Sequence, residues 1–378
     1  MKRGLAVRDD SYCDGECGIL VEMRVVYFFG VVFFIALLIQ GVLWRQVRLV
    51  DEPLWLERVA QLSFELERGE LDPTNPIYSG HPGMVAVMLG SLAHQAGAPL
   101  KGGLAISVAL LNALSIAVAV SLSRALRPKS MWWVVLAATL LFNTVYLRAS
   151  PTNAVMAPLS VLLVLLALWL YENYNHQRVQ QLTVLWGAFI GIGLATRWPT
   201  TLILFGPLFV LLSLKLGVKK MLVAGVSGLV VAVSIDPLMW YAPWDRFRYM
   251  VEHLFNSAYL ANQAVVGLID FVLLAPLAIL GLLMAVLLVV WRNHLFSPVS
   301  LDFLLILLII TGLFFLVFLN LDYQSVRYFQ PMILIWEGLL PLFLLSFFQK
   351  QKVAKVVFIL LLTGGHIFSL IYAMLLPG

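Results

Sequence analysis

Long apolar runs recur along this chain from residue 25 almost to its end. A run of about 17–25 apolar residues is what an α-helix needs to cross a lipid bilayer. Of the 378 residues, 61% are hydrophobic and only 12% are charged, and mean hydropathy is +0.94. Soluble domains do not reach this balance. Backbone groups in lipid must be paired internally, and the length of the runs favours helices over a barrel. The sequence therefore predicts an all-α polytopic membrane protein.

We expect about 11 transmembrane helices, from the length and apolar character of the runs. The expected spans are 25–44, 102–123, 131–149, 154–171, 182–197, 199–216, 221–241, 267–291, 301–320, 330–348 and 354–376. The apolar stretch 82–97 is short for a crossing and contains Gly83, Gly90 and His94. Its placement decides which loops share a side of the membrane.

The 25 Lys and Arg residues distinguish the two arrangements. If 82–97 does not cross and the N-terminus is cytoplasmic, most of these residues fall in cytoplasmic loops, as the positive-inside rule requires. If it crosses, the bias is reversed. We therefore expect 82–97 to lie at or dip into the outer interface. The net charge of +5 is explained by this loop bias, and we expect no nucleic-acid partner.

The N-terminal segment differs in composition from the rest of the chain. Residues 1–22 are polar and are predicted to form a disordered cytoplasmic tail, and Met23 is an alternative start. Residues 23–378 are predicted to form a single transmembrane domain that begins with a retained anchor helix. The two cysteines, Cys13 and Cys17, lack further ligands for a closed metal site.

The outer loops contain the polar residues that are most informative about function. The largest is the loop 45–101, in which Leu54–Arg68 has apolar residues at helical spacing with charges between them. We expect interfacial juxtamembrane helices there. A second outer segment, about 242–266, has a similar interfacial character.

Several polar residues share the predicted outer face. A carboxylate in this position can accept a proton from an attacking hydroxyl or amine, and arginines can bind a phosphate. The candidates are Asp51, Glu52, His81, Arg148, Asn153, Arg197, Arg327 and Tyr328. Acids are rare so close to hydrocarbon unless a site needs them.

Each candidate also has a structural interpretation. Asp51-Glu52 can be a solvated pair at a helix start, where acids are favoured by the helix dipole. The turn His81-Pro82-Gly83 can simply connect a loop to a helix. Arg327-Tyr328 can anchor a helix at the interface, and Arg197 can end a helical hairpin at the surface. The order of the motifs along the chain favours a functional role more than any single motif does.

That order resembles the glycosyltransferase-C superfamily, in particular the branch of protein O-mannosyltransferases and lipid A aminoarabinose transferases (glycosyltransferase family 39-like). The resemblance covers about residues 24–340. It rests on Asp51-Glu52-Pro53-Leu54-Trp55, His81-Pro82-Gly83, Arg148 to Asn153, Gly187 to Arg197, and Arg327-Tyr328 followed by Pro331.

The resemblance implies a membrane glycosyltransferase that moves a sugar from a polyprenyl-phosphate donor to a lipid, glycan or protein acceptor. It implies Asp51 as catalytic base and Glu52 as its support. His81, Arg148, Arg197, Arg327 and Tyr328 would bind the donor phosphate, and Trp55 and Asn153 would contact substrate. The protein is then expected in the plasma membrane, with its active site facing outside.

The chain departs from the family pattern at Asn153, His81 and Gly83. Asn153 stands where the family has a second acid, so we expect no metal and no other cofactor. His81 replaces a lysine of the aminoarabinose branch, and Gly83 replaces the second proline of a Pro-Pro element.

Two other function classes compete with the transferase. A transporter or lipid flippase also uses polar residues in a membrane domain. Transporters of this size usually contain two related halves, and we find no internal repeat. A non-catalytic scaffold of a membrane assembly is the third reading, but it does not explain why polar residues gather on one face.

Overall fold

The computed structural model describes residues 15–46, 52–72, 74–78, 83–128, 130–142, 151–257, 276–290, 299–320 and 326–347, with a few isolated positions beyond them. These residues form α-helices and one 3-10 helix, and they contain no strand. The helices are α1 Gly15–Gln46, α2 Glu52–Arg68, η1 Pro76–Tyr78, α3 Met84–Gln95, α4 Leu100–Leu126, α5 Trp132–Phe142, α6 Pro151–Glu172, α7 Val179–Leu216, α8 Val218–Ile235, α9 Leu238–Tyr241, α10 Pro243–Ser257, α12 Pro276–Val290, α13 Leu301–Asn320 and α14 Val326–Phe347. The predicted all-α class is therefore confirmed for this part of the chain.

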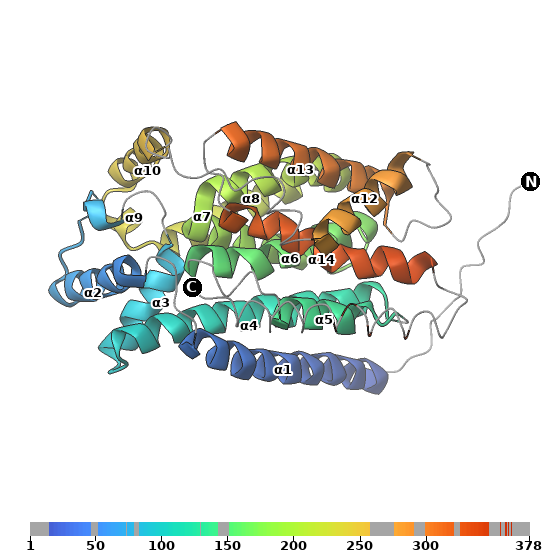
Figure 1. Cartoon of the computed structure of the whole chain (residues 1–378), viewed down its shortest axis with the longest axis horizontal. Helices are drawn as coiled ribbons and strands as arrows, with labels where there is room; N and C mark the ends of the chain where they lie inside the picture. Colours follow the sequence, from blue (N-terminus) through green and yellow to red (C-terminus); the bar gives the residue numbers. More distant parts are fainter. Residues whose placement is uncertain are drawn as a thin grey trace, which may run out of the picture.

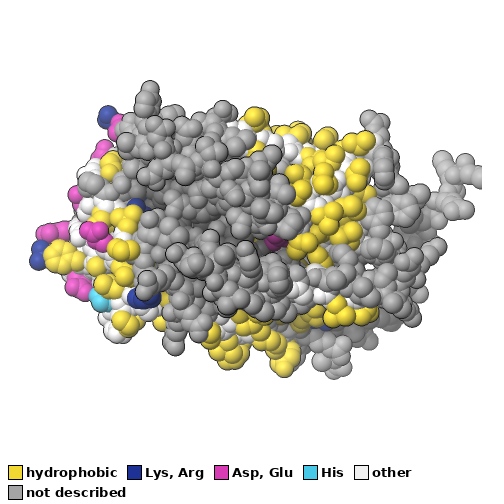
Figure 2. Space-filling view, viewed as in Figure 1, with side chains coloured by type: hydrophobic (Ala, Val, Ile, Leu, Met, Phe, Trp, Pro, Cys, Tyr) yellow, Lys and Arg dark blue, Asp and Glu magenta, His cyan; other side chains and the backbone are white. Residues whose placement is uncertain are grey.

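The long helices lie side by side along the longest axis of the molecule, and the short helices α2, α3, α9 and α10 gather at one end (Figure 1). We call this the cap end. Figure 2 shows acidic, basic and histidine side chains at the cap end, and mainly hydrophobic side chains on the described surface away from it. This division between a polar end and an apolar flank is typical of a membrane-embedded bundle.

Four of the described helices are long and apolar enough to cross a membrane: Leu100–Leu126, Ala154–Glu172, Val179–Leu216 and Val218–Ile235. Shorter apolar helices accompany them, at Val26–Val42, Met84–Gln95, Trp132–Phe142, Leu277–Val290, Leu301–Leu316 and Gln330–Leu344. The chain is thus an integral membrane protein. The count of about 11 spans stays a prediction, because several expected spans fall partly outside the described residues.

The expected division between 182–197 and 199–216 falls at Arg197, where α7 is broken into two helical segments. The element bounds depart from the expected spans in two other places. The expected span 221–241 ends earlier, at Ile235, because Pro237 cannot continue the helix and the Asp236 carboxylate accepts from the N–H of Leu238 at 3.1 Å. Helix α1 begins at Gly15, inside the segment that was assigned to the tail.

The short helix α3 covers most of the stretch 82–97, and its position relative to the membrane stays a prediction. Its 12 residues span about 18 Å at 1.5 Å per residue. That is well below the roughly 30 Å of a hydrocarbon core. The helix lies with α2 at the cap end (Figure 1).

Polar side chains join the buried helices. The amide of Asn112 in α4 donates to the side chain of Gln40 in α1 at 3.1 Å. Arg127, after α4, makes a bidentate contact of 3.1 Å to both oxygens of Glu172 at the end of α6. Such bonds hold membrane helices together where lipid supplies no hydrophobic force between them.

Candidate functional site

Helix α2 presents one apolar face to the bundle. Trp55, Val59 and Leu62 are buried at helical spacing, as the sequence predicted for Leu54–Arg68, whereas Leu54 itself is exposed. The guanidinium of Arg58 lies 4.6 Å from the centre of the Trp55 ring, and its Nε donates to the carbonyl of Ile77 at 2.7 Å. The first turn of α2 is thereby fixed against the segment that leads to α3.

Four elements meet at Gly83, which directly precedes α3. Its backbone has φ +49° and ψ +11°, a conformation that favours glycine. A Cβ at this position would overlap the Trp55 ring, whose Cη2 would be 2.5 Å away, and would lie 2.9 Å from Cγ2 of Thr152 in α6. The N–H of Gly83 donates to the carbonyl of Thr196 in α7 at 3.0 Å. The starts of α2, α3 and α6 therefore converge on one point of α7.

That point is the break in α7. Arg197 has φ −159° and ψ 82°, an extended conformation that interrupts the helix, and its side chain is buried. Pro199 then starts a new helical segment, a position that proline favours. The Thr201 hydroxyl donates to the Arg197 carbonyl at 2.9 Å.

Two buried polar atoms beside the break have no hydrogen-bond partner within the described part of the chain. They are Nε1 of Trp198 and Oγ1 of Thr200. Buried polar atoms are normally hydrogen-bonded, so two buried polar atoms without a partner next to a buried arginine are unusual. The break therefore combines a cation, a helix N-terminus and spare donors, all of which suit an anionic group.

A second polar cluster lies at the cap end. Arg246 of α10 is fully buried, with its Nε 3.5 Å from the Asp236 carboxylate and both Nη atoms 3.4 Å from the Tyr78 carbonyl. Burial raises the pKa of the Asp236 carboxyl, and the neighbouring Arg246 offsets part of that increase. We call Asp236, Arg246 and Tyr78 the Arg246 clasp.

The Tyr78 side chain extends this cluster to α2. Burial and the negative charge of Glu65 raise the pKa of the Tyr78 phenol well above its usual range, so the hydroxyl stays protonated. The Glu65 carboxylate also accepts from Gln61 at 2.8 Å and from Asn75 at 3.1 Å. Asn75, Ile77 and Tyr78 are thus held by polar contacts to α2 and α10.

The structure describes the predicted site residues to different extents. Trp55 and Arg197 are fully described, and both are buried near Gly83. Glu52 starts α2, Asn153 lies in α6 next to Thr152, and Arg327 and Tyr328 lie in the first turn of α14, but their side chains are outside the description. Asp51, His81 and Arg148 lie outside the described residues. The roles of all nine residues stay predictions.

Sequence reasoning did not single out the Arg246 clasp. Arg246 lies in the segment 242–266, which the sequence predicts to be interfacial, whereas the structure buries it completely. One indication in the sequence is that Asp236 directly precedes Pro237 at the end of an apolar run. Glu337, an acid within α14, is also buried.

The residues described here offer no evident metal centre. Within them, no group of three His, Cys, Asp or Glu side chains is placed to hold a metal ion. Asn153, which follows Thr152 at the start of α6, supplies an amide where a carboxylate would favour a cation. Metal independence stays a prediction.

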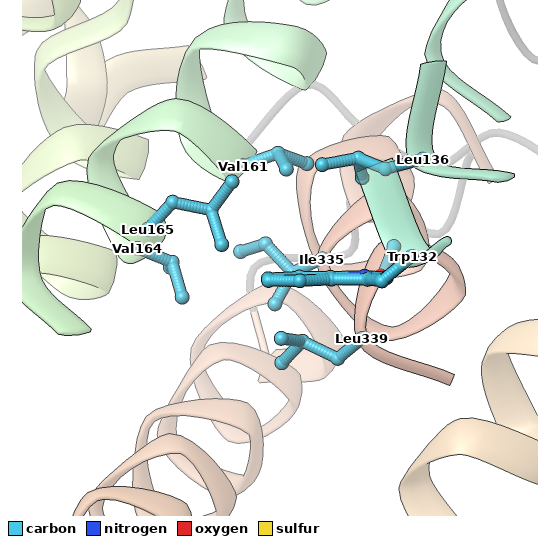
Figure 3. A pocket seen from close by; sticks show the side chains of 8 residues that line it. Trp132, Leu136, Val161, Val164, Leu165, Ile335 and Leu339 are labelled. Carbon is cyan, nitrogen blue, oxygen red and sulfur yellow. The ribbon is translucent and has the colours of Figure 1, made fainter. Parts of the chain in front are cut away.

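A narrow gap between α5, α6 and α14 is not part of this site (Figure 3). It has no room for a water molecule, and its lining is apolar: Trp132, Leu136, Val161, Val164, Leu165, Ile335, Gly338 and Leu339. The indole N–H of Trp132 donates to the Gly338 carbonyl at 2.8 Å across it. The gap contains none of the predicted site residues, so we interpret it as helix packing.

Comparison with known proteins identifies the fold. The structure is similar to the crystal structure of an oligosaccharyltransferase from Archaeoglobus fulgidus, determined in complex with zinc and sulfate, with a TM-score of 0.51 and 16% sequence identity. The match covers 90% of this chain and 52% of that one, so the chain spans about half the length of this relative. No family model matches the sequence, and no curated protein matches it. The likeness shows that this chain has an oligosaccharyltransferase-like fold.

Proposed function

We propose that this protein is a membrane glycosyltransferase that moves a sugar from a polyprenyl-phosphate carrier to an acceptor at the extracytoplasmic face of the plasma membrane. One observation carries the proposal. The starts of α2, α3 and α6 converge on the break in α7, at the polar cap end of an oligosaccharyltransferase-like fold. Each of these elements carries or adjoins a motif that the sequence marked as part of a transferase site.

The carrier phosphate would bind at the break. Arg197 supplies a buried positive charge, and the helical segment after it supplies a helix N-terminus. Arg148, Arg327, Tyr328 and His81 are proposed to complete the phosphate site. Negative charge on the leaving phosphate grows in the transition state, so cations placed there lower the barrier.

Asp51 is proposed as the base of the transfer, one residue before α2 begins. The acceptor oxygen or nitrogen attacks the anomeric carbon of the sugar, and its proton passes to the Asp51 carboxylate. The bond between the anomeric carbon and the phosphate oxygen breaks, and its electron pair leaves with the polyprenyl phosphate. A direct displacement of this kind inverts the anomeric configuration. Glu52 supports Asp51, and Trp55 and Asn153 help to shape the substrate site.

The finer assignment follows the sequence motifs. They favour the protein O-mannosyltransferase and lipid A aminoarabinose transferase branch, with a hexose or pentose donor and a lipid, glycan or protein acceptor. The reaction as written needs no metal and no nucleotide. The transporter alternative gains no support from any contact in the described residues.

Replacing the proposed base gives the direct test. The full chain is reconstituted in vesicles and supplied with polyprenyl-phosphate-linked hexoses and pentoses, radiolabelled in the sugar, and with total membrane extract as acceptor. Asp51→Asn should reduce transfer by about a hundredfold or more, as loss of a general base does. The matched control is Asp72→Asn, because Asp72 is an exposed acid of the same loop. Full transfer by Asp51→Asn would contradict the base assignment.

A further inference from the structure

Helices α9 and α10 are held close to the membrane boundary by their connection to α8. Helix α8 is of membrane-spanning length and ends at Ile235, and α9 begins at Leu238. The indole N–H of Trp240 donates to the carbonyl of Val233 in the last turn of α8, at 2.7 Å. Trp240 therefore lies at the level of the end of this span, and its side chain is 53% exposed.

The Arg246 clasp sets the rotation of α10 about its own axis. Arg246 and Met250, one turn apart, are both buried against the protein. Arg246 contacts Asp236 at the end of α8 and the Tyr78 carbonyl in η1. A buried arginine joined to two separate elements fixes which side of α10 faces outward.

The outward side of α10 is divided into an aromatic sector and a charged sector. At about 100° per residue, Phe247 and Trp244 lie roughly 100° and 160° around the helix from Arg246. Trp244 is 81% exposed and Phe247 is 51% exposed. The charged sector follows on the next part of the circumference, where Arg248 pairs with Glu252 at 2.7 Å and Asp245 is exposed.

We propose that α9 and α10 form a docking surface for the phospholipid bilayer in which the protein is embedded. Trp240, Trp244 and Phe247 would lie at the boundary between headgroups and acyl chains, on the leaflet at the cap end. Tryptophan is enriched at this depth, since its ring is apolar while its N–H needs a polar partner. A helix with adjacent apolar and charged faces lies in the interface plane. The Arg248–Glu252 pair would remain in water.

This surface has a consequence for the loop before α3. The clasp holds the Tyr78 carbonyl, and Tyr78 precedes Gly83 by only a short segment. The depth of α10 in the interface thus helps to fix the position of Tyr78. The docking surface does not depend on the transfer reaction, so failure of either proposal leaves the other standing.

Site-directed spin labelling tests the docking surface. In a background in which Cys13→Ser and Cys17→Ser remove the two cysteines, single cysteines replace Trp244 and Phe247 on the aromatic sector, and Asp245 and Glu252 on the charged sector. The labelled full chain is reconstituted in phosphatidylcholine–phosphatidylglycerol vesicles. We expect collision rates with oxygen, relative to a water-soluble nickel chelate, to be severalfold higher at 244 and 247 than at 245 and 252. Equal ratios at the four positions, or nickel access at 244 and 247, would overturn the proposal.

A second comparison tests the clasp. The double variant Arg246→Met with Asp236→Asn (the paired variant) removes both buried charges together. Arg246→Lys retains the positive charge but loses the planar guanidinium group. If the clasp sets the rotation of α10, the difference between the two sectors should shrink in the paired variant and persist at least partly in Arg246→Lys. An unchanged difference in the paired variant would show that the clasp does not orient the helix.

Discussion

Gly83 is a residue at which backbone conformation and packing both require glycine. Its φ is +49°, and a Cβ would overlap the Trp55 ring and press on Thr152. Gly83→Ala should therefore destabilise the protein for two reasons. The left-handed backbone conformation should cost about 1–2 kcal/mol, and overpacking should cost about 1–3 kcal/mol. Thermal unfolding of the purified protein, followed by tryptophan fluorescence, measures the loss.

Gly69→Ala is the matched control for the packing part of that cost. Gly69 has a similar φ of +69°, but nothing lies within 4 Å of its Cβ position. Gly69→Ala should show only the backbone cost. Trp55→Phe removes the outer atoms of the indole and should restore part of the stability of Gly83→Ala. If the two alanine variants unfold at the same temperature, the contact between Gly83 and Trp55 is not important for stability.

Arg197 is the described residue on which phosphate binding most depends in our proposal. Its buried guanidinium lies at the break of α7. Arg197→Gln should weaken binding of polyprenyl phosphate by about tenfold to a hundredfold, the equivalent of one charged hydrogen bond. Binding is measured by quenching of intrinsic fluorescence in detergent. Arg127→Gln is the control, since Arg127 pairs with Glu172 at the other end of α6. Equal affinity of Arg197→Gln and the unaltered protein would refute this role.

At the scale of elements, the packing of the first segment of α7 against α8 depends on close backbone approach. A Cβ on Gly228 of α8 would lie 2.8 Å from the Gly187 carbonyl oxygen of α7, and backbone cannot withdraw as a side chain can. Gly225, three residues earlier in α8, would meet only ring atoms of Phe209 at 3.8 and 3.9 Å. We expect Gly228→Ala to cost about 1–3 kcal/mol and Gly225→Ala to be neutral or stabilising by up to about 1 kcal/mol. Unfolding temperatures of the two variants decide this, and a reversed order would show that the close approach of α7 and α8 at Gly228 is not important for stability.

At the scale of the whole molecule, the placement of α3 fixes the topology. If α3 does not cross, cysteines replacing Glu70 and Ala96 should react with an impermeant maleimide from the same side of the membrane. A cysteine replacing Asn175, in the turn after α6, should react from the opposite side. All three positions are described, and the background lacks Cys13 and Cys17. Labelling of Glu70 and Ala96 from opposite sides would invert the topology of every later helix.

The helical class and much of the segmentation could be predicted from sequence, because each depends on local composition. Apolar runs predicted the helices now seen as α4, α6 and α8, and the spacing of Trp55, Val59 and Leu62 predicted the buried face of α2. The division of α7 was also predicted, because Pro199 marks a helix start, and the break falls at Arg197. The sequence could not predict that the N–H of Gly83 bonds to the Thr196 carbonyl beside that break.

The sequence by itself determined that this chain is a helical membrane protein, because long apolar runs have few alternatives in lipid. It also supplied the motif order on which the transferase proposal rests. Only the tertiary structure decided that Trp55, Gly83, Thr152 and Thr196 meet, and that Arg246 is buried between Asp236 and Tyr78. Contacts between residues far apart in the chain depend on how whole helices pack. Hydropathy reports only which residues avoid water, and not which partners they find.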